Sequence, residues 1–453
     1  MAGTGDDLQI HHNGSDSTIS NSTGLFYIQN AGDLRLRVNN SEAAVHCVAN
    51  GAVELYHDNS KKLETTSTGA TVTGSLVTTY PTSNRNLLVN GSMRVAQRLD
   101  GDDEGSFDLS GGNYRGVDLT MVRTSNSSTL NVSHPAHDSL RTLGLQQSLK
   151  VISNTATSSL GSTAYSTVVL HLEGEHMIPT GWGFSQAKPC TLSFYVRSTV
   201  AGTFTGSFGN SGNNRCNAFE YTINNASTWE RKTITVSGDT TGSWDKTQGL
   251  GAKITFSLGH GSSFSTANAN TWTASELMGT NNQTMAFLQT SNNFWEISGV
   301  QFEVGNAATE IERQDFGPTL MKCKRYYYQS RDYGSNLHAL NNWNSPEATL
   351  NQSKHERYYD THYFHPVEMR ANPTMTFFGT NGVANSGVRL EIPGVRNDEI
   401  TSGSSKNPNT VVTSDTGFIA RYIMQNADVP NSDYRSGSGN AFIRLTFSAS
   451  AEF

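Results

Sequence analysis

Closely spaced carboxylates are the first residues in this chain whose types and spacing could do chemistry. Glu173 and Glu175 are separated by one glycine, and residues 102–104 read Asp-Asp-Glu. A glycosidase needs two carboxyl groups that face each other across a cleft, about 5 to 9.5 Å apart. Residues two apart on a strand share a face, which would bring Glu173 and Glu175 together. Acidic pairs on solvated strands and loops are common, however, and we expect no enzyme activity from this chain.

An acidic run is a weak candidate for a metal site. It contains Asp100, Asp102, Asp103 and Glu104. Calcium takes about six to eight oxygen ligands, which such a loop can supply. The run lacks the complete calcium-loop pattern, so an acidic loop in water is favoured over a structural calcium site. No nucleotide-binding fingerprint is present, and we expect no other cofactor.

Aromatic residues in polar loops are candidates for sugar contacts. Tyr and Trp faces stack on the apolar side of sugar rings while their polar ends form hydrogen bonds. Trp182 is flanked by glycines, Trp343 lies among asparagines, and Tyr358 belongs to a tyrosine-rich segment nearby. We predict these three as glycan-binding residues. Trp229 and Trp295 lie in or beside strand patterns, where packing in a core is the more common role.

Composition and charge exclude several classes of function. The net charge is −7, charged residues make up 16%, and 42 of the 453 residues are glycine. A nucleic-acid surface needs clustered Lys and Arg, and no dense basic run exists. No stretch of about 18 apolar residues occurs, so we expect no membrane insertion. The length predicts about three domains.

The cysteines are predicted to be free thiols. Cys47, Cys190, Cys216 and Cys323 are scattered along the chain without metal-ligand spacing. Disulfides are rare in proteins that fold in a reducing cytosol.

Residues 1–84 are predicted to form an interwoven β stem. Residues 7–15 resemble residues 52–60, which indicates a repeat, and Leu34, Leu36 and Val38 alternate with polar residues. These strands carry too few apolar residues for a core of their own, and such small units usually need oligomerisation. We therefore expect the stem to wind with other copies of the chain.

The rest of the chain predicts two further β domains with a helix between them. Alternating apolar residues and turn-rich loops over 85–316 are typical of a two-sheet sandwich. A Phe-Gly-Pro sequence at 316–318 indicates a short helix, placed at 317–328, since proline fits the first turn. Residues 329–453 return to alternation and are predicted to form a C-terminal β-sandwich tip.

Two motifs bracket the middle region. Residues 86–98 read Asn-Leu-Leu-Val-Asn-Gly-Ser-Met-Arg-Val-Ala-Gln-Arg, and residues 294–305 read Phe-Trp-Glu-Ile-Ser-Gly-Val-Gln-Phe-Glu-Val-Gly. Together they resemble the sandwich modules of bacteriophage tail fibres and other virion appendages. Residues 50–56 (Asn-Gly-Ala-Val-Glu-Leu-Tyr) resemble the stem repeats of cyanophage or marine phage fibres. The resemblance implies a jelly roll similar to carbohydrate-binding modules, which often hold a structural calcium, followed by a hinge helix.

The resemblance also implies a function. It indicates a homotrimeric virion fibre, folded in the host cytoplasm, that binds host surface polysaccharide and contacts other virion proteins through its N-terminal end. Three linked copies would raise the avidity above the affinity of one site. The main alternative is a capsid decoration or head-fibre protein with a structural role. A polysaccharide-degrading enzyme is the least favoured alternative.

Overall fold

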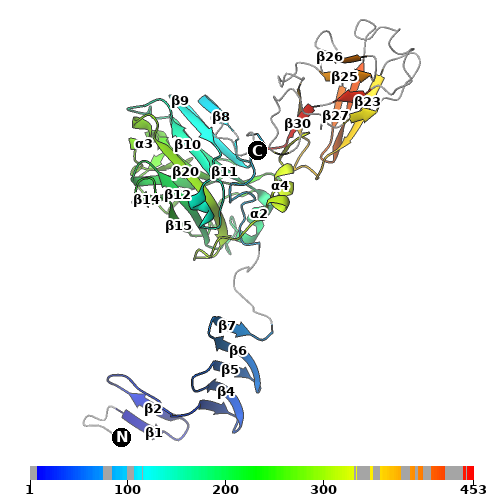
Figure 1. Cartoon of the computed structure of the whole chain (residues 1–453). Helices are drawn as coiled ribbons and strands as arrows, with labels where there is room; N and C mark the ends of the chain where they lie inside the picture. Colours follow the sequence, from blue (N-terminus) through cyan, green and yellow to red (C-terminus); the bar gives the residue numbers. More distant parts are fainter. Residues whose placement is uncertain are drawn as a thin grey trace. The chain divides into compact units, whose positions relative to one another are not determined.

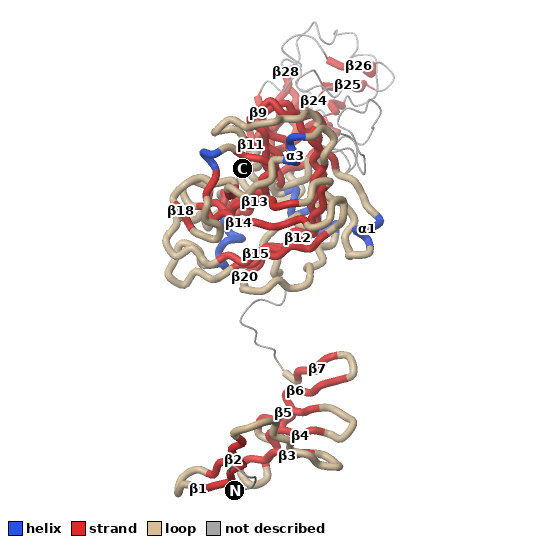
Figure 2. Tube along the Cα trace, turned by 90° about the vertical axis from the view of Figure 1, so that its left-hand side faces the viewer, coloured by secondary structure: helices blue, strands red, loops and turns tan. Residues whose placement is uncertain are grey.

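The protein, here a computed structural model, consists almost entirely of strands and loops (Figure 2). Its contacts divide it into two compact units, Met1–Thr79 and Tyr80–Phe453 (Figure 1). The all-β fold class predicted from the sequence is confirmed. The structure describes residues 8–74, 84–98, 107–114, 116–330, 333, 347–349, 358–378, 388–392, 396–400, 410–423, 442–444 and 446–453.

The first unit contains a hairpin and a five-stranded sheet, the stem sheet. The hairpin pairs β1 (Leu8–His12) with β2 (Ser17–Asn21). The stem sheet is an antiparallel meander of β3 (Leu34–Val38), β4 (Glu42–Cys47), β5 (Val53–His57), β6 (Ser60–Thr66) and β7 (Gly69–Val72). The two similar sequence segments each begin a hairpin, β1–β2 and β5–β6.

The second unit is built around an antiparallel sheet that curls into a sandwich. Its strands are β8 (Phe107–Tyr114), β9 (Thr120–Ser133), β10 (Leu149–Ser153), β11 (Tyr165–Glu173), β12 (Cys190–Ser198), β13 (Gly202–Asn210), β14 (Cys216–Ile223), β15 (Glu230–Val236), β16 (Leu250–His260), β18 (Trp272–Thr273) and β20 (Phe294–Val304). The order is β15-β12-β20-β10-β9-β11-β16-β13-β14-β18, with β8 beside β9.

Strand β9 belongs to both layers of this sandwich. Its first part, Thr120–Thr124, pairs with β11, and its last part, Leu130–Ser133, pairs with β10. Strands β14 and β15, far apart in the strand order, lie against each other and close the structure. One long strand therefore turns a continuous sheet into two facing layers.

The core between the layers comes from the alternating apolar residues. Leu192, Phe194 and Val196 of β12 are fully buried, and so are Ile254, Phe256 and Leu258 of β16. The intervening polar residues of these strands point to the opposite face. This arrangement confirms the period-two prediction for the middle region.

The two motifs that bracket the middle region are hydrogen bonded to each other. Asn86 Nδ2 donates to Val300 O at 2.9 Å, and Val300 N donates to Gly91 O at 2.7 Å. A Cβ on Gly91 would lie 1.9 Å from Val300 O, so the close approach requires glycine there. Residues 86–91 therefore act as an added edge on β20.

The helices are short. They are α1 (Asp138–Arg141), α2 (Gly174–Met177), α3 (Ala286–Gln289), α4 (Phe316–Lys324), and the 3-10 turns η1 (Ile178–Thr180) and η2 (Ser262–Phe264). The helix predicted at 317–328 exists as α4 but ends earlier, because Tyr327 already begins a strand. Among the described residues, no helix is long and apolar enough to cross a membrane.

The C-terminal region contains three small sheets. Their strand orders are β21 (Tyr327–Gln329)-β30 (Thr446–Ser450)-β24 (Thr374–Phe378), β22 (Glu347–Thr349)-β29 (Phe442–Arg444)-β25 (Val388–Ile392)-β26 (Arg396–Ile400), and β23 (Tyr358–Phe364)-β28 (Gly417–Ile423)-β27 (Thr410–Thr413). The Phe447 ring of β30 lies 4.9 Å from the Phe418 ring of β28 and 5.0 Å from the Tyr363 ring of β23. Aromatic packing thus joins the first and third sheets.

Polar contacts tie the beginning of this region to the sandwich. Gln97 Nε2 donates to Tyr327 O at 2.6 Å, Arg98 forms an ion pair with Glu452, and Arg325 forms one with Glu173 at 2.8 Å. These contacts are consistent with the grouping of Tyr80–Phe453 as one unit. The separate domains proposed for 85–316 and 329–453 stay a prediction.

Candidate functional site

Most of the predicted site residues fall outside the described residues. This holds for Trp343 and for the calcium candidates Asp100, Asp102, Asp103 and Glu104. Tyr358 is described only through its backbone, which pairs with Ile423 in the β23–β28 ladder. The predictions for these residues stay open.

The structure corrects the prediction for Trp182. It was predicted to stack on sugar from an exposed loop, but its exposed fraction is 0%. Its ring lies 4.9 Å from that of Trp244 and 5.1 Å from that of Trp272, and its Nε1 donates to Lys188 O at 2.9 Å. Burial of a large ring with a satisfied N–H outweighs the polar character of the loop. Trp182 is a core residue.

The carboxylate pair does not form a catalytic cleft. Glu173 is buried at the end of β11, where it forms an ion pair with Arg325 at 2.8 Å and accepts a hydrogen bond from the Tyr326 hydroxyl. The strand ends at Glu173, and Glu175 belongs to α2. The two carboxyl groups therefore do not share a strand face as expected, and Glu173 has a structural partner.

No metal cluster marks a site in the described part of the chain, and Cys47 of β4 is the one partly exposed thiol among the described residues. No group of three or more His, Cys, Asp or Glu side chains gathers there in a way that could hold a metal ion. Cys190, Cys216 and Cys323 are buried, and burial raises the pKa of each thiol. A buried neutral thiol is a poor nucleophile.

The outer side of one sandwich layer is polar. On β16, Lys253 and Thr255 point outward between core residues, and Arg123 does so on β9. Ser207 pairs with Thr255 across the β13–β16 ladder. Strand β11 lies between β9 and β16, so only long side chains such as those of Arg123 and Lys253 can approach each other across it. The strands therefore place a cation from β9 and another from β16 over the same face.

A segment of residues 275–284, here called the strap, covers one side of this face and contains the short strand β19 (Gly279–Thr280), which pairs with β17 (Ser265–Thr266). Leu277 O accepts hydrogen bonds from the Ser207 hydroxyl at 2.6 Å and from the Cys216 thiol at 3.3 Å. Thr280 Oγ1 donates to Glu220 Oε1 at 2.6 Å, which fixes the strap to β14. The Leu277 side chain packs on Cys216 and Ala218. Among the described residues, the strap therefore covers the β13 and β14 side of the face.

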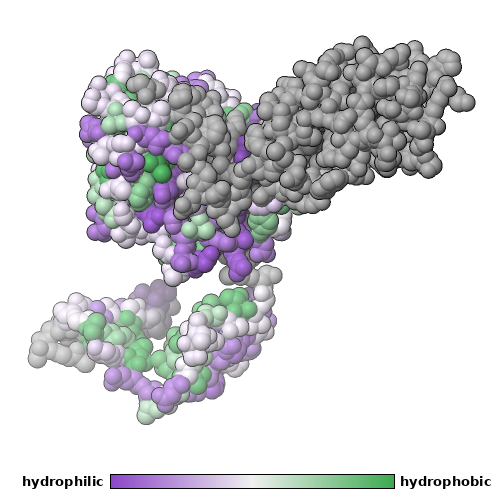
Figure 3. All heavy atoms as spheres, turned by 45° about the horizontal axis from the view of Figure 1, so that its top comes forward, coloured by the Kyte–Doolittle hydropathy of each residue, from purple (hydrophilic) through white to green (hydrophobic). Residues whose placement is uncertain are grey.

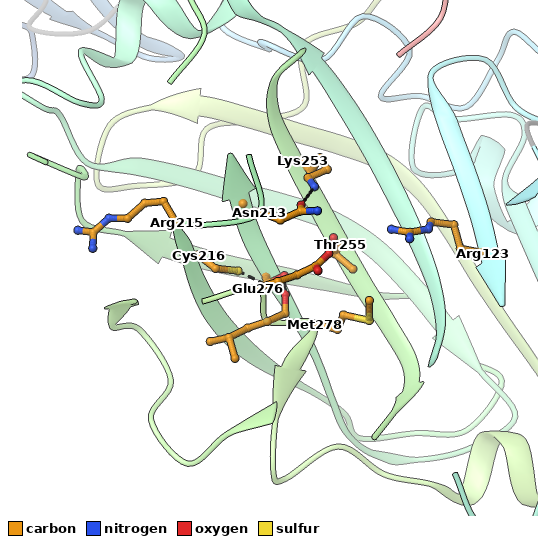
Figure 4. A pocket seen from close by; sticks show the side chains of 11 residues that line it. Arg123, Asn213, Arg215, Cys216, Lys253, Thr255, Glu276 and Met278 are labelled. Carbon is orange, nitrogen blue, oxygen red and sulfur yellow. Dashed lines mark hydrogen bonds between the residues drawn. The ribbon is translucent and has the colours of Figure 1, made fainter. Parts of the chain in front are cut away.

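A small pocket, here called the Arg123–Lys253 pocket, remains between the strap and the open strands. Its cavity volume is only about 20 Å³, and the about 350 Å³ of empty space around it includes open solvent, so a ligand group would sit at its mouth and not inside it. Figure 4 shows Lys253, Asn213 and Arg123 around the hollow, with Thr255 on its floor and Glu276 and Met278 on the strap side. The complete lining is Arg123, Ser207, Gly209, Asn213, Arg215, Cys216, Lys253, Thr255, Glu276, Leu277 and Met278.

Polar and aromatic contacts hold the two cations in place. The Lys253 ammonium donates to Asn213 Oδ1. Arg123 Nη2 donates to the Tyr165 hydroxyl at 3.0 Å, and the guanidinium carbon lies 4.9 Å from the Tyr165 ring centre. The Tyr165 ring in turn meets the Phe264 ring edge-on at 5.8 Å. Such contacts restrict the Lys253 and Arg123 side chains before a ligand binds. Less side-chain conformational entropy is then lost on binding.

The pocket has more positive than negative charge. Burial lowers the pKa of Lys253, the Glu276 carboxylate opposes this shift, and the charge of Arg123 lowers the pKa further. Arg215 is neutralised by Asp239, with Nε 2.9 Å from Oδ2, and its guanidinium end is directed away from Lys253 and Asn213 (Figure 4). Two cations therefore face one carboxylate, although the whole chain has a net charge of −7.

Sequence reasoning missed every residue of this pocket. The available signal was a charged residue at an outward position of an alternating strand, as with Lys253 between Ala252 and Ile254. That signal is weak, because most outward charges are simply solvated. The partners Arg123 and Lys253 are far apart in the sequence, and only the strand order β9-β11-β16 brings them together.

No family model and no curated protein matches this chain. Among solved structures, it is similar to the enzymatically active domain of tailspike protein 4 of bacteriophage CBA120, with 11% identity and a TM-score of 0.23 over 49% of this chain and 21% of that one. It is also similar to the family 11 carbohydrate-binding module of cellulase Lic26A-Cel5E of Clostridium thermocellum, with 12% identity and a TM-score of 0.23 over 45% of this chain and 97% of the module.

A third similar structure is TmCBM61 in complex with β-1,4-galactotriose, with 9% identity and a TM-score of 0.24 over 49% of this chain and 100% of that one. This chain thus spans about a fifth of the tailspike domain, 21%, and nearly the whole of the two modules. TM-scores this low leave ligand and assembly open. What the chain itself shows is an all-β protein with a polar pocket on the outer side of its sandwich.

Proposed function

We propose that this protein is a phage virion fibre that binds host surface polysaccharide reversibly through the Arg123–Lys253 pocket. One observation carries the proposal: an open pocket of donors and acceptors lies on rigid strands at the outer side of the sandwich. The resemblance of residues 86–98 and 294–305 to virion fibre modules supports the place of the protein in the virion, after folding in the host cytoplasm.

The pocket suits the chemistry of sugar binding. Asn213 and Thr255 can both donate to and accept from hydroxyls, Lys253 and Arg123 donate, and Glu276 accepts. Sites of this kind combine a few placed polar groups with apolar surface, and the half-buried rings of Tyr165 and Phe264 lie beside Arg123. No step in this proposal breaks a bond, so the protein acts as a binder and not as an enzyme.

The stem sheet supports assembly of several copies. Leu36, Val45, Leu55, Leu63 and Val72 are paired in register across β3 to β7 and form one apolar row. Leu36 is 52% and Leu55 is 42% exposed in the single chain. Figure 3 shows hydrophobic side chains gathered along one side of the stem. A contiguous exposed apolar row of this kind supports contact with a partner surface.

We propose that this apolar row packs against other copies of the same chain in a homotrimer. Its opposite side carries a charged network, with His46 between Asp33 at 2.9 Å and Glu54 at 3.0 Å, which suits contact with water. Packing the apolar rows of copies together would remove them from water. Three linked bodies would then gain about 10²- to 10⁴-fold in avidity over one pocket.

A side chain that fills the pocket tests the function. Gly209 lines the pocket, and a Cβ there would meet only ordinary contacts, at 3.8 Å from Cys216 Sγ and 3.9 Å from Arg215 O. Gly209→Tyr should therefore weaken binding of the full chain to host cells or their purified polysaccharide by about tenfold or more. Gly161→Tyr is the matched control, since nothing lies within 4 Å of its Cβ.

The outcomes separate the candidate sites. If Gly209→Tyr binds like Gly161→Tyr while Trp343→Ala loses binding, the site lies in the predicted tip and the pocket assignment is wrong. If neither change matters and antibody labelling finds the protein on the capsid, the decoration function replaces the fibre function. Release of new reducing ends from the polysaccharide would reveal an enzyme.

A further inference from the structure

We infer that the Arg123–Lys253 pocket selects acidic polysaccharides, with a carboxylate or sulfate group of a sugar placed between the two cations. This inference rests on the proposed function and adds a ligand class to it. A neutral sugar would need only donors and acceptors, which Asn213 and Thr255 already supply. The pocket adds two positive charges to them.

The first argument is the charge balance of the pocket. Arg123 and Lys253 face it, while Glu276 is the one carboxylate in its lining. The two cations come from different strands, β9 and β16, and no carboxylate among the described residues forms an ion pair with either of them. Glu276 compensates one of the two positive charges, and the like charges of Arg123 and Lys253 that remain in the hollow repel each other. An anion between them would relieve this repulsion.

The second argument is the contrast with three other partly buried arginines of this unit. Arg197 is paired with Glu296 at 3.1 Å, Arg215 with Asp239, and Arg325 with Glu173 at 2.8 Å. Each of these guanidinium groups is satisfied by a carboxylate of its own chain, as is usual for buried charges. The Arg123 guanidinium instead forms no ion pair with a carboxylate of the described residues, and it donates to the hydroxyl of the neutral Tyr165.

The third argument is unused hydrogen-bonding capacity at Arg123. Its Nε is buried and has no hydrogen-bond partner within the described part of the chain, and only Nη2 donates, to Tyr165. A buried unpaired donor costs free energy that a ligand acceptor would recover. A guanidinium fork matches the paired oxygens of a carboxylate or sulfate, while the Lys253 ammonium acts as a point charge.

Glu276 limits the kind of anion. Its carboxylate lies in the lining beside Lys253 and would repel a densely charged chain. It can instead accept hydrogen bonds from sugar hydroxyls. The pocket therefore fits a single anionic group, such as one uronate carboxylate or one sulfate of a sparsely sulfated glycan, better than a cluster of closely spaced sulfates.

Matched pairs of polysaccharides test this inference on the full chain. The probes are polygalacturonate and its carboxyl-reduced neutral form, and lightly sulfated dextran and plain dextran. The wild-type chain should bind at least one acidic member about tenfold or more tightly than its neutral parent. The member that shows the preference identifies a carboxylate or a sulfate as the source of the charge.

Charge-removing variants locate the effect. Arg123→Gln and Lys253→Gln should each reduce the preference for the acidic member about tenfold, and Arg123→Lys should retain part of it. The controls are Arg141→Gln and Lys188→Gln, because both residues are exposed and lie outside the pocket lining. They should leave binding within about twofold. Thermal melting of each variant verifies that it is folded.

The results distinguish failure of the inference from failure of the function. If acidic and neutral forms bind equally and Gly209→Tyr still blocks both, the inference is wrong and the proposed function stands. If the control variants reduce binding as much as Arg123→Gln and Lys253→Gln do, the preference belongs to the whole surface and the inference is wrong. If the chain binds none of these polysaccharides and no host polysaccharide, both are wrong.

Discussion

The stem sheet and the sandwich are built from the same kind of alternating strand, but the apolar face is buried in the sandwich and partly exposed in the stem sheet. In the sandwich, Leu192 and Phe194 of β12 are fully buried. In the stem sheet, the corresponding apolar positions Leu36 and Leu55 remain 52% and 42% exposed. Period-two alternation therefore produces a strand with one apolar face in both regions, and does not decide what covers that face.

This difference in burial depends on whether a second layer of strands from the same chain packs on the apolar face. The sandwich closes because β9 pairs with β11 at one end and with β10 at the other, so that both layers come from one chain. The stem sheet is a simple meander of five strands, and among the described residues of its unit no second layer covers it. The proposed homotrimer would bury its apolar row against other chains, whereas the sandwich buries its core within one chain.

The largest effect is expected from a large cavity in the sandwich. Trp182→Ala removes a ring that packs on Trp244 and Trp272, and should lower the free energy of unfolding by about 3–5 kcal/mol. Phe184→Ala is the control, because Phe184 lies in the same loop but is 57% exposed. Chemical denaturation of both variants measures the difference. Equal stability of the two would mean that Trp182 is not a core residue, and would restore it as a candidate for sugar contact.

A smaller loss of stability is expected at the close backbone contact between Gly91 and Val300. Gly91→Ala places a Cβ 1.9 Å from Val300 O and should cost about 2–3 kcal/mol, as overpacking does. Gly317→Ala is the control, since nothing lies within 4 Å of that Cβ. Thermal melting compares the two. An unchanged melting temperature for Gly91→Ala would show that the 86–98 motif does not pack on β20 as described.

A substitution in the stem sheet should change the oligomeric state of the chain and not the stability of the sandwich. Leu36 and Arg35 are neighbours on opposite faces of β3, with about half of each side chain exposed, 52% and 50%. Leu36→Asn places a polar group in the proposed interface at a cost of about 1–3 kcal/mol per chain and should shift the oligomer toward smaller species. Arg35→Asn should not. Sedimentation velocity across a dilution series measures the shift, and identical behaviour of the two variants would remove the apolar row from the interface.

The smallest expected effect is the pH dependence of the stability that Glu296 contributes. Burial alone would raise the pKa of Glu296, but hydrogen bonds and charges from His137 and Arg197 bring this pKa below its usual value of 4.5. A lowered pKa means that the stabilisation is present above pH 4.5 and is lost as the pH falls through the folded-state pKa. Glu296→Gln should therefore cost about 1–2 kcal/mol near neutral pH and less in acid. Denaturant unfolding of both proteins at several pH values measures this, and a constant difference would contradict the assignment.

The local features of the fold could be predicted from the sequence, and the long-range ones could not. Alternation identified β12, β16 and β20, and Phe-Gly-Pro marked the beginning of α4. The role of β9 in both layers depends on pairings between distant segments, which no local pattern encodes. The pocket depends on the same pairings, because Arg123 and Lys253 meet only through the strand order.

Trp182 shows the limit of reasoning from composition. Glycines on both sides and polar neighbours indicated an exposed loop. Gly181, with φ of 64°, instead allows the chain to turn so that the indole enters the core. Loop composition describes the backbone environment and not the direction of one large side chain.

The mass of the full chain in solution tests the central claim most directly, namely that the stem needs partner chains while the sandwich does not. Multi-angle light scattering at micromolar concentration should give three times the monomer mass of 49.1 kDa. A folded, soluble species of 49.1 kDa whose stem strands are protected from hydrogen exchange would contradict the account, because it would show that the apolar row is stable without a partner.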